Sequence, residues 1–276
     1  MADNVTFQNF RDMGGLPCPD GQKIRRWKLF RTPCIVPKTP GDWEFLENCG
    51  LDVIIDLRDR EEVRYKPDRL PKGCDYINAP VFEEGKYKYI LVSRKAKLRV
   101  ATLFGTKRQR LVKQEKLESY RDMPFSNAYQ QIFRCMDQGK TIAFHCSEGK
   151  DRTGFAAALI ELAFGREQDD ILNQYLLSNK YRPRKDRSYM RKLGYSEDFV
   201  DDIAYCEETH EELFLMAKSA ILARYGSLFS SWRKVPSLRA MEALGNICGK
   251  NLISPRSGWS AGKLFIWKKL DKGISP

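Results

Sequence analysis

The sequence predicts an α/β protein with a central, mostly parallel sheet flanked by helices, and two observations support this class. Short apolar runs rich in β-branched residues alternate with helical segments along the 276 residues, which is the pattern of a parallel sheet covered by helices. One such run, residues 141–145, leads into a polar loop that contains glycine and then into an apolar helix. Because ligands of these sheets bind at the carboxyl ends of strands, we expect the functional site in that loop.

The individual elements follow from apolar periodicity and from turn and cap residues. A Pro-Asp-Gly turn signal at 19–21 favours a hairpin between 16–18 and 23–31. Buried strands are expected at 51–59 and 141–145, and a further strand is expected at 74–82. Helices are expected at 41–50, 126–140, 152–165 and 167–181, with one or two long helices at 196–226. Ser126 and Ser196 are the expected caps of two of these helices.

The domain organisation is expected to be simple. We assign residues 1–232 to one functional domain and residues 233–276 to a C-terminal extension packed on it. Residues 86–116 are strongly basic, lack proline and contain only Glu115 as an acid, so we expect a helical insertion or lid beside the sheet.

The charge composition indicates which kinds of molecule the protein can bind. The net charge of +12 favours binding of polyanions, such as phosphorylated proteins, inositol lipids at an anionic membrane surface, or nucleic acid; the alternative is a solvated basic surface. The first twelve residues have no apolar core, and the longest apolar stretch, 155–165, is too short to cross a bilayer. We therefore expect a soluble, cytoplasmic protein.

The eight cysteines are scattered without C-x-x-C pairs, which predicts free thiols in a long chain of this kind. With two histidines and no clustered cysteines, neither a zinc site nor another metal or cofactor is expected.

The loop within 144–154, FHCSEGKDRTG, combines a thiol with acids and cations. The amides of 147–152 can curl into a ring that, with the N-terminus of the next helix, binds an anion. Gly149 allows the loop to bend. Cys146 would lie at the bottom as a thiolate, because helix N-termini and nearby cations lower the pKa of thiols. A phosphate held above it would be placed for in-line attack, giving a phosphocysteine intermediate.

Neighbouring side chains have matching chemistry. Arg152 can donate two parallel hydrogen bonds to a phosphate and stabilise its charge in the transition state. A carboxyl group must protonate the leaving group and later activate water. Asp151 is the nearest candidate, and Glu83 and Glu84 are its rivals if their loop folds over the site.

Supporting roles are expected for several further residues. The Thr153 hydroxyl would hydrogen-bond the sulfur, and His145 would orient the loop or tune the thiolate. Arg58 would either reach the phosphate or the loop, or form a salt bridge with Asp56 or Asp12. Asn9, Arg11 and Asp12 would either brace the loop or shape the turn at Gly14 and Gly15.

The segment HCSEGKDRTG resembles the phosphate-binding loop of cysteine-dependent protein tyrosine phosphatases. It is most similar to the bacterial and fungal tyrosine/serine branch, dual-specificity and active on phosphoinositides, whose loop has the form HCxxGKDRTG. Further similar segments are NFRDMGG at 9–15, LFRT at 29–32, IDLRDREEV at 55–63, ILNQYLLSNKY at 171–181 and ARYGSLFSSW at 223–232. The resemblance extends from about residue 7 to residue 232.

The resemblance implies the protein tyrosine phosphatase fold, with Cys146 as nucleophile, Arg152 as phosphate clamp and Asp151 as acid and base. The substrate phosphate would lie among Ser147, Glu148, Gly149, Lys150 and Thr153. Lys150 resembles a lysine linked to acidic substrates, including phosphoinositides, although a solvated loop lysine is an equal alternative. Glu148 departs from the pattern, since an acid at the mouth repels a dianion unless it pairs with Lys150.

The leading hypothesis is a phosphatase for phosphotyrosine in proteins, and also for phosphoserine and phosphothreonine. The runner-up is a phosphoinositide phosphatase. A catalytically silent phosphate-binding module and a sulfurtransferase are further alternatives, but the latter has a shorter loop before its arginine. Nucleic acid is not expected as a partner, and the sequence does not define the oligomeric state.

Overall fold

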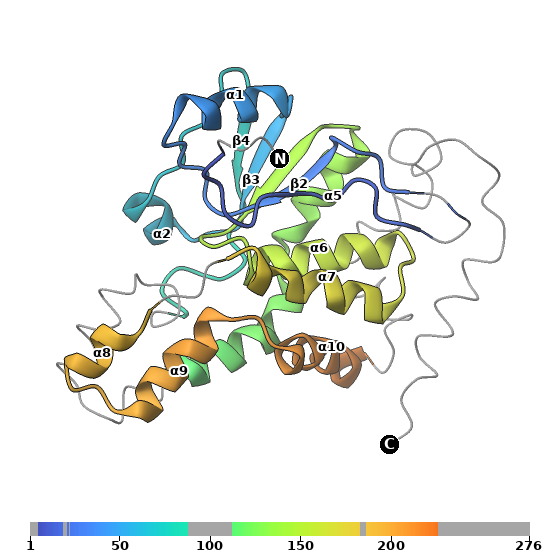
Figure 1. Ribbon diagram of the computed structural model, residues 1–276. Helices are drawn as coiled ribbons and strands as arrows, with labels where there is room; N and C mark the ends of the chain where they lie inside the picture. Colours follow the sequence, from blue (N-terminus) through green and yellow to red (C-terminus); the bar gives the residue numbers. More distant parts are fainter. Residues whose placement is uncertain (1–4, 19–20, 22, 88–111, 183–185, 226–276) are drawn as a thin grey trace.

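The computed structural model describes residues 5–18, 21, 23–87, 112–182 and 186–225 (Figure 1). The strands are β1 (Arg11–Asp12), β2 (Leu29–Thr32), β3 (Val53–Asp56), β4 (Asp75–Asn78) and β5 (Ile142–His145). The helices are α1 (Pro40–Asn48), α2 (Arg60–Tyr65), the 3₁₀ helix η2 (Met123–Phe125), α5 (Tyr129–Asp137), α6 (Asp151–Ala163), α7 (Gln168–Lys180), α8 (Ser188–Lys192), α9 (Glu197–Glu207) and α10 (Glu211–Tyr225). Residues 112–122 form a further helix.

The strands form one sheet in the order β1-β2-β5-β3-β4. Strand β5 lies in the middle, parallel to both neighbours, with His145 opposite Thr32 of β2 and Asp56 of β3. Strand β4 is parallel to β3, and β1 is antiparallel to β2. The expectation of a mostly parallel sheet flanked by helices is confirmed, and it places the end of β5 at the centre of the sheet edge where ligands bind.

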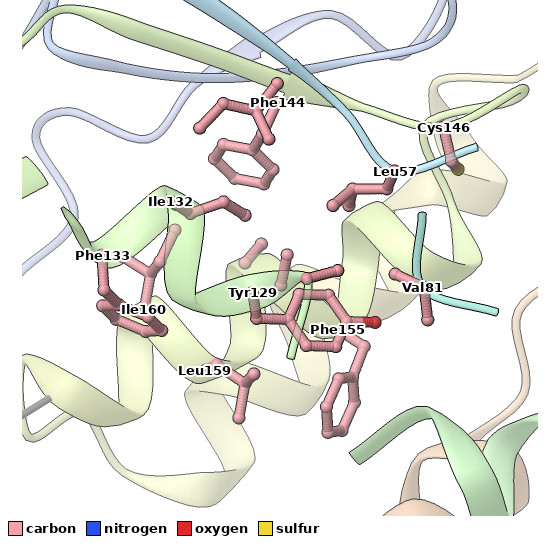
Figure 2. Close-up of a cluster of buried hydrophobic side chains, with 14 of the residues drawn as sticks. Leu57, Val81, Tyr129, Ile132, Phe133, Phe144, Cys146, Phe155, Leu159 and Ile160 are labelled. Carbon is pink, nitrogen blue, oxygen red and sulfur yellow. The ribbon is translucent and has the colours of Figure 1, made fainter. Parts of the chain in front are cut away.

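Successive side chains of a strand point to opposite faces of the sheet, so the buried residues form one core on each face. Phe144 faces the larger core, where it lies in one cluster with Ile132 of α5 and with Phe155 and Leu159 of α6 (Figure 2). The neighbouring Ala143 belongs to a smaller cluster on the other face, under α1. Helix α6 is buried over most of its length, which is why its sequence is apolar on nearly every side.

Most predicted elements are confirmed. The strands expected at 51–59, 74–82 and 141–145 are β3, β4 and β5, and the four shorter predicted helices are α1, α5, α6 and α7. In the predicted hairpin region, an antiparallel bridge joins Pro17 to Lys23. The segment 196–226 contains two helices, because the chain turns between Glu207 and Glu211.

The two predicted caps behave differently. Ser196 caps α9 by accepting a hydrogen bond from the amide of Phe199. Ser126 lies before the start of α5 and accepts from the amide of Ala128, so the helix begins later than expected.

Two predicted segments fall wholly or mainly outside the described residues: most of the basic stretch 86–116, and all of 233–276. The division into a domain at 1–232 and an extension therefore stays a prediction. The helix at 112–122 agrees with the helical expectation for the end of the basic stretch. Within the part of the chain that the structure describes, every helix is too short or too polar to span a membrane.

Candidate active site

The polar loop runs from Cys146 at the end of β5 to Asp151, the first residue of α6. The side chain of Lys150, the residue before this helix, makes no capping hydrogen bond, so it does not compete with an anion for the amides of the first turn. Gly149 has φ +65°, and a Cβ atom there would lie 2.6 Å from the backbone of Thr32. Glycine is therefore required by both the conformation and the packing of the loop.

Two buried side chains hold the loop from below. Asn9 Nδ2 donates to the carbonyl of Gly149 at 2.8 Å, and Arg31 Nη2 donates to the same oxygen at 2.9 Å. These two hydrogen bonds fix the Gly149 carbonyl and thereby hold the course of the loop. The contact of Asn9 agrees with the expectation that it braces the loop, whereas the contact of Arg31 was not predicted.

Cys146 is buried, with 3% of the residue exposed, at the margin of the larger core (Figure 2). Burial opposes ionisation of the thiol, but the charge of Arg152 and hydrogen bonds from the hydroxyl and amide of Thr153 lower the pKa of Cys146 below its usual value. Among the described residues, the buried Thr153 hydroxyl has no oxygen or nitrogen partner, so it is free to donate to a thiolate. The site thus favours the nucleophilic form of the sulfur.

Arg152 lies in a two-point ion pair with Glu62 of α2. Its Nη1 and Nη2 atoms lie 2.5 and 2.8 Å from the two carboxylate oxygens, and Ser147 Oγ donates to Glu62 Oε1 at 2.5 Å. The Nε–H and the second Nη2–H of Arg152 make no hydrogen bond within the described part of the chain. Arg152 is therefore held in place and keeps two donors for an anion.

The role of Glu62 was missed from the sequence. Asp59 and Glu62 form a capping box at the start of α2, with Glu62 accepting from the Asp59 amide and Asp59 accepting from the Glu62 amide. The D-x-x-E spacing in DREE signals this helix start. It does not reveal that Glu62 contacts a residue 90 positions further along the chain.

His145 stabilises the base of the loop through a buried charge network. Its Nδ1 lies 3.2 Å from the Cys146 carbonyl, and its Nε2 lies 3.3 Å from Asp68 Oδ2. Burial alone would lower the pKa of His145, but Asp68 and Asp56 raise it above its usual value. The contact of the ring with the Cys146 carbonyl links the imidazole to the strand end, as the expected orienting role requires.

Arg58 belongs to the same network and does not reach the loop. Its guanidinium lies 2.7 Å from Asp56 Oδ2 and 2.6 Å from Asp68 Oδ2. The salt bridge with Asp56 was one expected alternative, while Asp68 replaces Asp12 as the second partner. Asp56, Asp68 and His145 are close enough together to hold a metal ion, but the arginine neutralises both carboxylates. Their contacts are those of a structural ion-pair cluster.

Asp12 shapes the adjacent turn. It accepts hydrogen bonds from the amides of Gly14 and Trp27, at 2.8 and 3.2 Å. Within the described part of the chain its carboxylate makes no hydrogen bond to the loop, so its contacts agree with the alternative in which Asp12 shapes the turn. Arg11 donates to the Gln174 carbonyl and to Ser178 Oγ of α7, so it joins β1 to that helix.

Asp151 has an unusual set of partners. Its Oδ1 contacts Lys116 Nζ and accepts from Tyr120 OH at 2.6 Å, and its Oδ2 lies 3.2 Å from Lys150 Nζ. Although burial opposes ionisation, the two lysines hold the pKa of Asp151 well below its usual range. At neutral pH Asp151 is a carboxylate, with its side chain 25% exposed.

Glu148 pairs with Lys150, as expected, but both residues also have partners that were not expected. Lys150 is 2% exposed and donates to the Cys206 carbonyl of α9 at 2.5 Å, so the solvated-lysine alternative is wrong. Glu148, at the loop surface, lies 2.6 Å from Arg182 and 3.9 Å from Lys150. Arg182 and Lys150 thus counteract the negative charge of Glu148, which would otherwise repel a phosphate.

The rival acids Glu83 and Glu84 are exposed, and Glu84 lies 3.9 Å from Arg64 of α2. Among the described residues, neither carboxylate hydrogen-bonds the loop, whereas Asp151 is part of it.

Comparison with known proteins agrees with this geometry. A model of the tyrosine phosphatase family matches residues 4–235. H16_A0669 of Cupriavidus necator, named for the tyrosine-protein phosphatases, is 33% identical over 191 residues, or 68% of this chain and 67% of its own. The triple specificity protein phosphatase PtpB of Mycobacterium tuberculosis is 27% identical over 192 residues, covering 64% of this chain and 68% of its own.

The solved structure of P. aeruginosa TpbA covers 72% of this chain and 89% of its own at 12% identity, with a TM-score of 0.30, which is too low to support a conclusion. The family match spans most of the sequence and includes the whole loop from Cys146 to Arg152. The chain belongs to the tyrosine phosphatase family, a family of enzymes that act on phosphorylated substrates.

Proposed function

We propose that the protein hydrolyses phosphotyrosine in proteins, and also phosphoserine and phosphothreonine, through a phosphocysteine intermediate on Cys146. One observation carries the proposal: a buried thiol with a lowered pKa lies at the strand end beside an arginine that keeps two donors. A thiolate and a fixed guanidinium in one loop suit nucleophilic attack on a phosphoryl group.

The proposed reaction has two steps. Cys146 attacks phosphorus while Arg152 and the loop amides bind the phosphate oxygens, and Asp151 delivers a proton to the leaving oxygen. Water then attacks the phosphocysteine, and Asp151 accepts a proton from it. The Glu148–Arg182 pair supports binding of a dianion, because the acid is neutralised at the surface of the loop.

The burial of Cys146 supports phosphotyrosine as the leading substrate. The phenol ring carries its phosphoryl group further from the peptide than the short side chain of phosphoserine does. With only 3% of Cys146 exposed, a long arm reaches the sulfur more readily than a short one.

A phosphoinositide is the second candidate, supported by the net charge of +12 and by the likeness to a phosphatase named for triple specificity. The position of Lys150 gives little support to a phosphoinositide substrate, since the Lys150 side chain is buried against α9. The same charge supports contact with an anionic membrane surface. The free thiols of the seven described cysteines support a reducing, cytoplasmic location.

A substrate panel tests the proposal. We expect the highest kcat/KM on a phosphotyrosyl peptide, followed by a phosphoseryl peptide of the same sequence. Short-chain phosphatidylinositol phosphates serve as the comparison, measured with and without anionic vesicles. Faster turnover of the lipids would replace the peptide assignment by the second candidate, and no phosphate release from any substrate would refute phosphatase activity.

Asp151→Asn is expected to lower kcat by about 10²- to 10⁴-fold on alkyl phosphates such as phosphoserine, because a poor leaving group depends on protonation. On p-nitrophenyl phosphate, whose leaving group needs no proton, the expected loss is smaller than about tenfold. Glu83→Gln and Glu84→Gln are the matched controls and should keep the wild-type ratio of the two rates. An equal loss on both substrates would remove Asp151 as the proton donor.

A further inference from the structure

The surroundings of Asp151 raise a question about the proton that it is proposed to deliver. A proton donor must be protonated before the leaving group departs, but Asp151 is ionised at neutral pH. A protonated neighbour in contact with the carboxylate can supply this proton, and the described candidates are Lys116, Lys150 and Tyr120.

The helix at 112–122 presents two of these groups to the same oxygen. Lys116 and Tyr120 are four residues apart, so their side chains lie on one face of the helix, and both contact Asp151 Oδ1. Tyr120 OH also lies 2.6 Å from Tyr175 OH of α7. The Lys116 side chain is 3% exposed and that of Asp151 is 25% exposed. Lys116 is thus almost completely buried, whereas the partly exposed Asp151 is the residue of this pair that a substrate can reach.

The two lysines differ in how firmly they hold a proton. Lys150 also donates to the Cys206 carbonyl. Although burial opposes its charge, Asp151 and then Glu148 raise the pKa of Lys150. Burial lowers the pKa of Lys116 to about 8. The positive charge of Lys150 also lowers it, whereas the negative charge of Asp151 opposes this shift.

The groups that face Lys116 come from three elements besides its own helix. They are Asp151 of α6, Lys150 at the end of the loop, and Cys206 of α9, with Tyr120 on the same helix. The phenol of Tyr120 is a poor proton store, because burial and Asp151 raise its pKa well above its usual value. Lys116 is therefore the most acidic protonated group in contact with Asp151.

We propose that Lys116 and Asp151 act as one proton-donating pair, in which Lys116 stores the proton and Asp151 passes it to the leaving oxygen. The proposal rests on the phosphocysteine mechanism above and extends it to a residue on a helix outside the loop. Lys116 acts through Asp151 and does not touch the substrate.

The proton balance closes over the two steps. As the S–P bond forms and the bond from phosphorus to the leaving oxygen breaks, a proton moves from Lys116 Nζ through the Asp151 carboxyl to that oxygen. Lys116 is left as a neutral amine beside the carboxylate. Water then attacks phosphorus, the S–P bond breaks and Cys146 leaves as a thiolate. The proton released by water returns through Asp151 to Lys116.

The test is a pH profile of kcat on a phosphoseryl peptide, with p-nitrophenyl phosphate as the substrate that needs no proton. In the wild type we expect kcat on the peptide to fall above about pH 8, where Lys116 loses its proton, while kcat on the aryl phosphate stays level. Lys116→Arg keeps the positive charge but does not release a proton in this range. It should lower kcat on the peptide by about 10²-fold at neutral pH and abolish the alkaline fall.

Three measurements separate the outcomes. Lys113→Arg, three residues earlier on the same helix and paired with Asp202, is the matched control and should keep the wild-type profile. Lys116→Met, which has no titrating group, should also lose the alkaline fall, and binding of inorganic vanadate checks that each variant retains the phosphate site. The proposed proton-donating pair would be refuted if kcat of the wild type on the peptide did not fall near pH 8. It would also be refuted if kcat of Lys116→Arg still fell there. No turnover of p-nitrophenyl phosphate by the wild type would instead refute the phosphatase mechanism itself.

Discussion

Cys146→Ser is expected to lower kcat by at least about 10⁴-fold on every phosphomonoester, while phosphopeptide binding persists. A serine hydroxyl stays protonated at neutral pH, so the positive charge of Arg152 and the Thr153 hydrogen bonds no longer produce a nucleophile. The phosphate contacts from Arg152 and the loop amides remain. Steady-state phosphate release and fluorescence-based peptide binding measure the two effects.

Cys135→Ser is the matched control, because Cys135 is also buried but lies on α5. It is expected to affect stability and not kcat. Substantial activity in Cys146→Ser would contradict the phosphocysteine mechanism. Alkylation by iodoacetamide, measured as a function of pH, tests the lowered pKa of Cys146. Alkylation of Cys146 should continue at pH values at which the other thiols no longer react. Its rate should fall only when the Cys146 thiolate itself is protonated.

Arg152→Lys is expected to lower kcat on p-nitrophenyl phosphate by about 10²- to 10³-fold, the second largest effect on that substrate. The size of the loss is that expected when an enzyme loses a fixed hydrogen-bond donor to the charge that develops in the transition state. Lysine keeps the positive charge, but it cannot pair with both oxygens of Glu62 and also present two donors to the phosphate. The measurement is kcat on p-nitrophenyl phosphate, for which protonation of the leaving group is unimportant.

Glu62→Gln separates the holding of Arg152 from its contact with phosphate. The amide still accepts one hydrogen bond but cannot form the charged two-point pair, so the expected fall in kcat is about tenfold, smaller than for Arg152→Lys. Thermal unfolding shows whether either change acts through stability, since both residues are buried. A kcat for Arg152→Lys within about threefold of wild type would contradict the proposed clamp.

The fold and the centre of the site could be predicted because their signals are local. The strand, loop and helix from residue 141 to residue 165 are contiguous, and each has its own pattern of apolar and polar residues. Such patterns reflect burial along one element, so they also predicted β3 and α7. The position of Cys146 before a helix N-terminus follows from the same contiguous stretch, as does the proximity of Arg152 and Asp151.

The partners of these residues depend on contacts between distant elements. Glu62 and Lys116 contact the loop or α6 from 90 and 35 residues away, and nothing in their local sequence distinguishes them from other charged residues on a helix. Burial supplies the physical reason that their contacts matter. A charge removed from water must find a specific partner, and that partner is set by which helices pack together.

Asp151 shows most clearly what local sequence and tertiary packing each contribute. Its place at the first turn of α6, beside Arg152, follows from the sequence and suggests acid and base chemistry. Its ionisation follows from Lys116 and Lys150, which packing of the 112–122 helix and of α9 brings around it. Periodicity along a chain encodes where an element buries its face, whereas the protonation of a carboxyl depends on the charges that other elements place within a few ångströms of it.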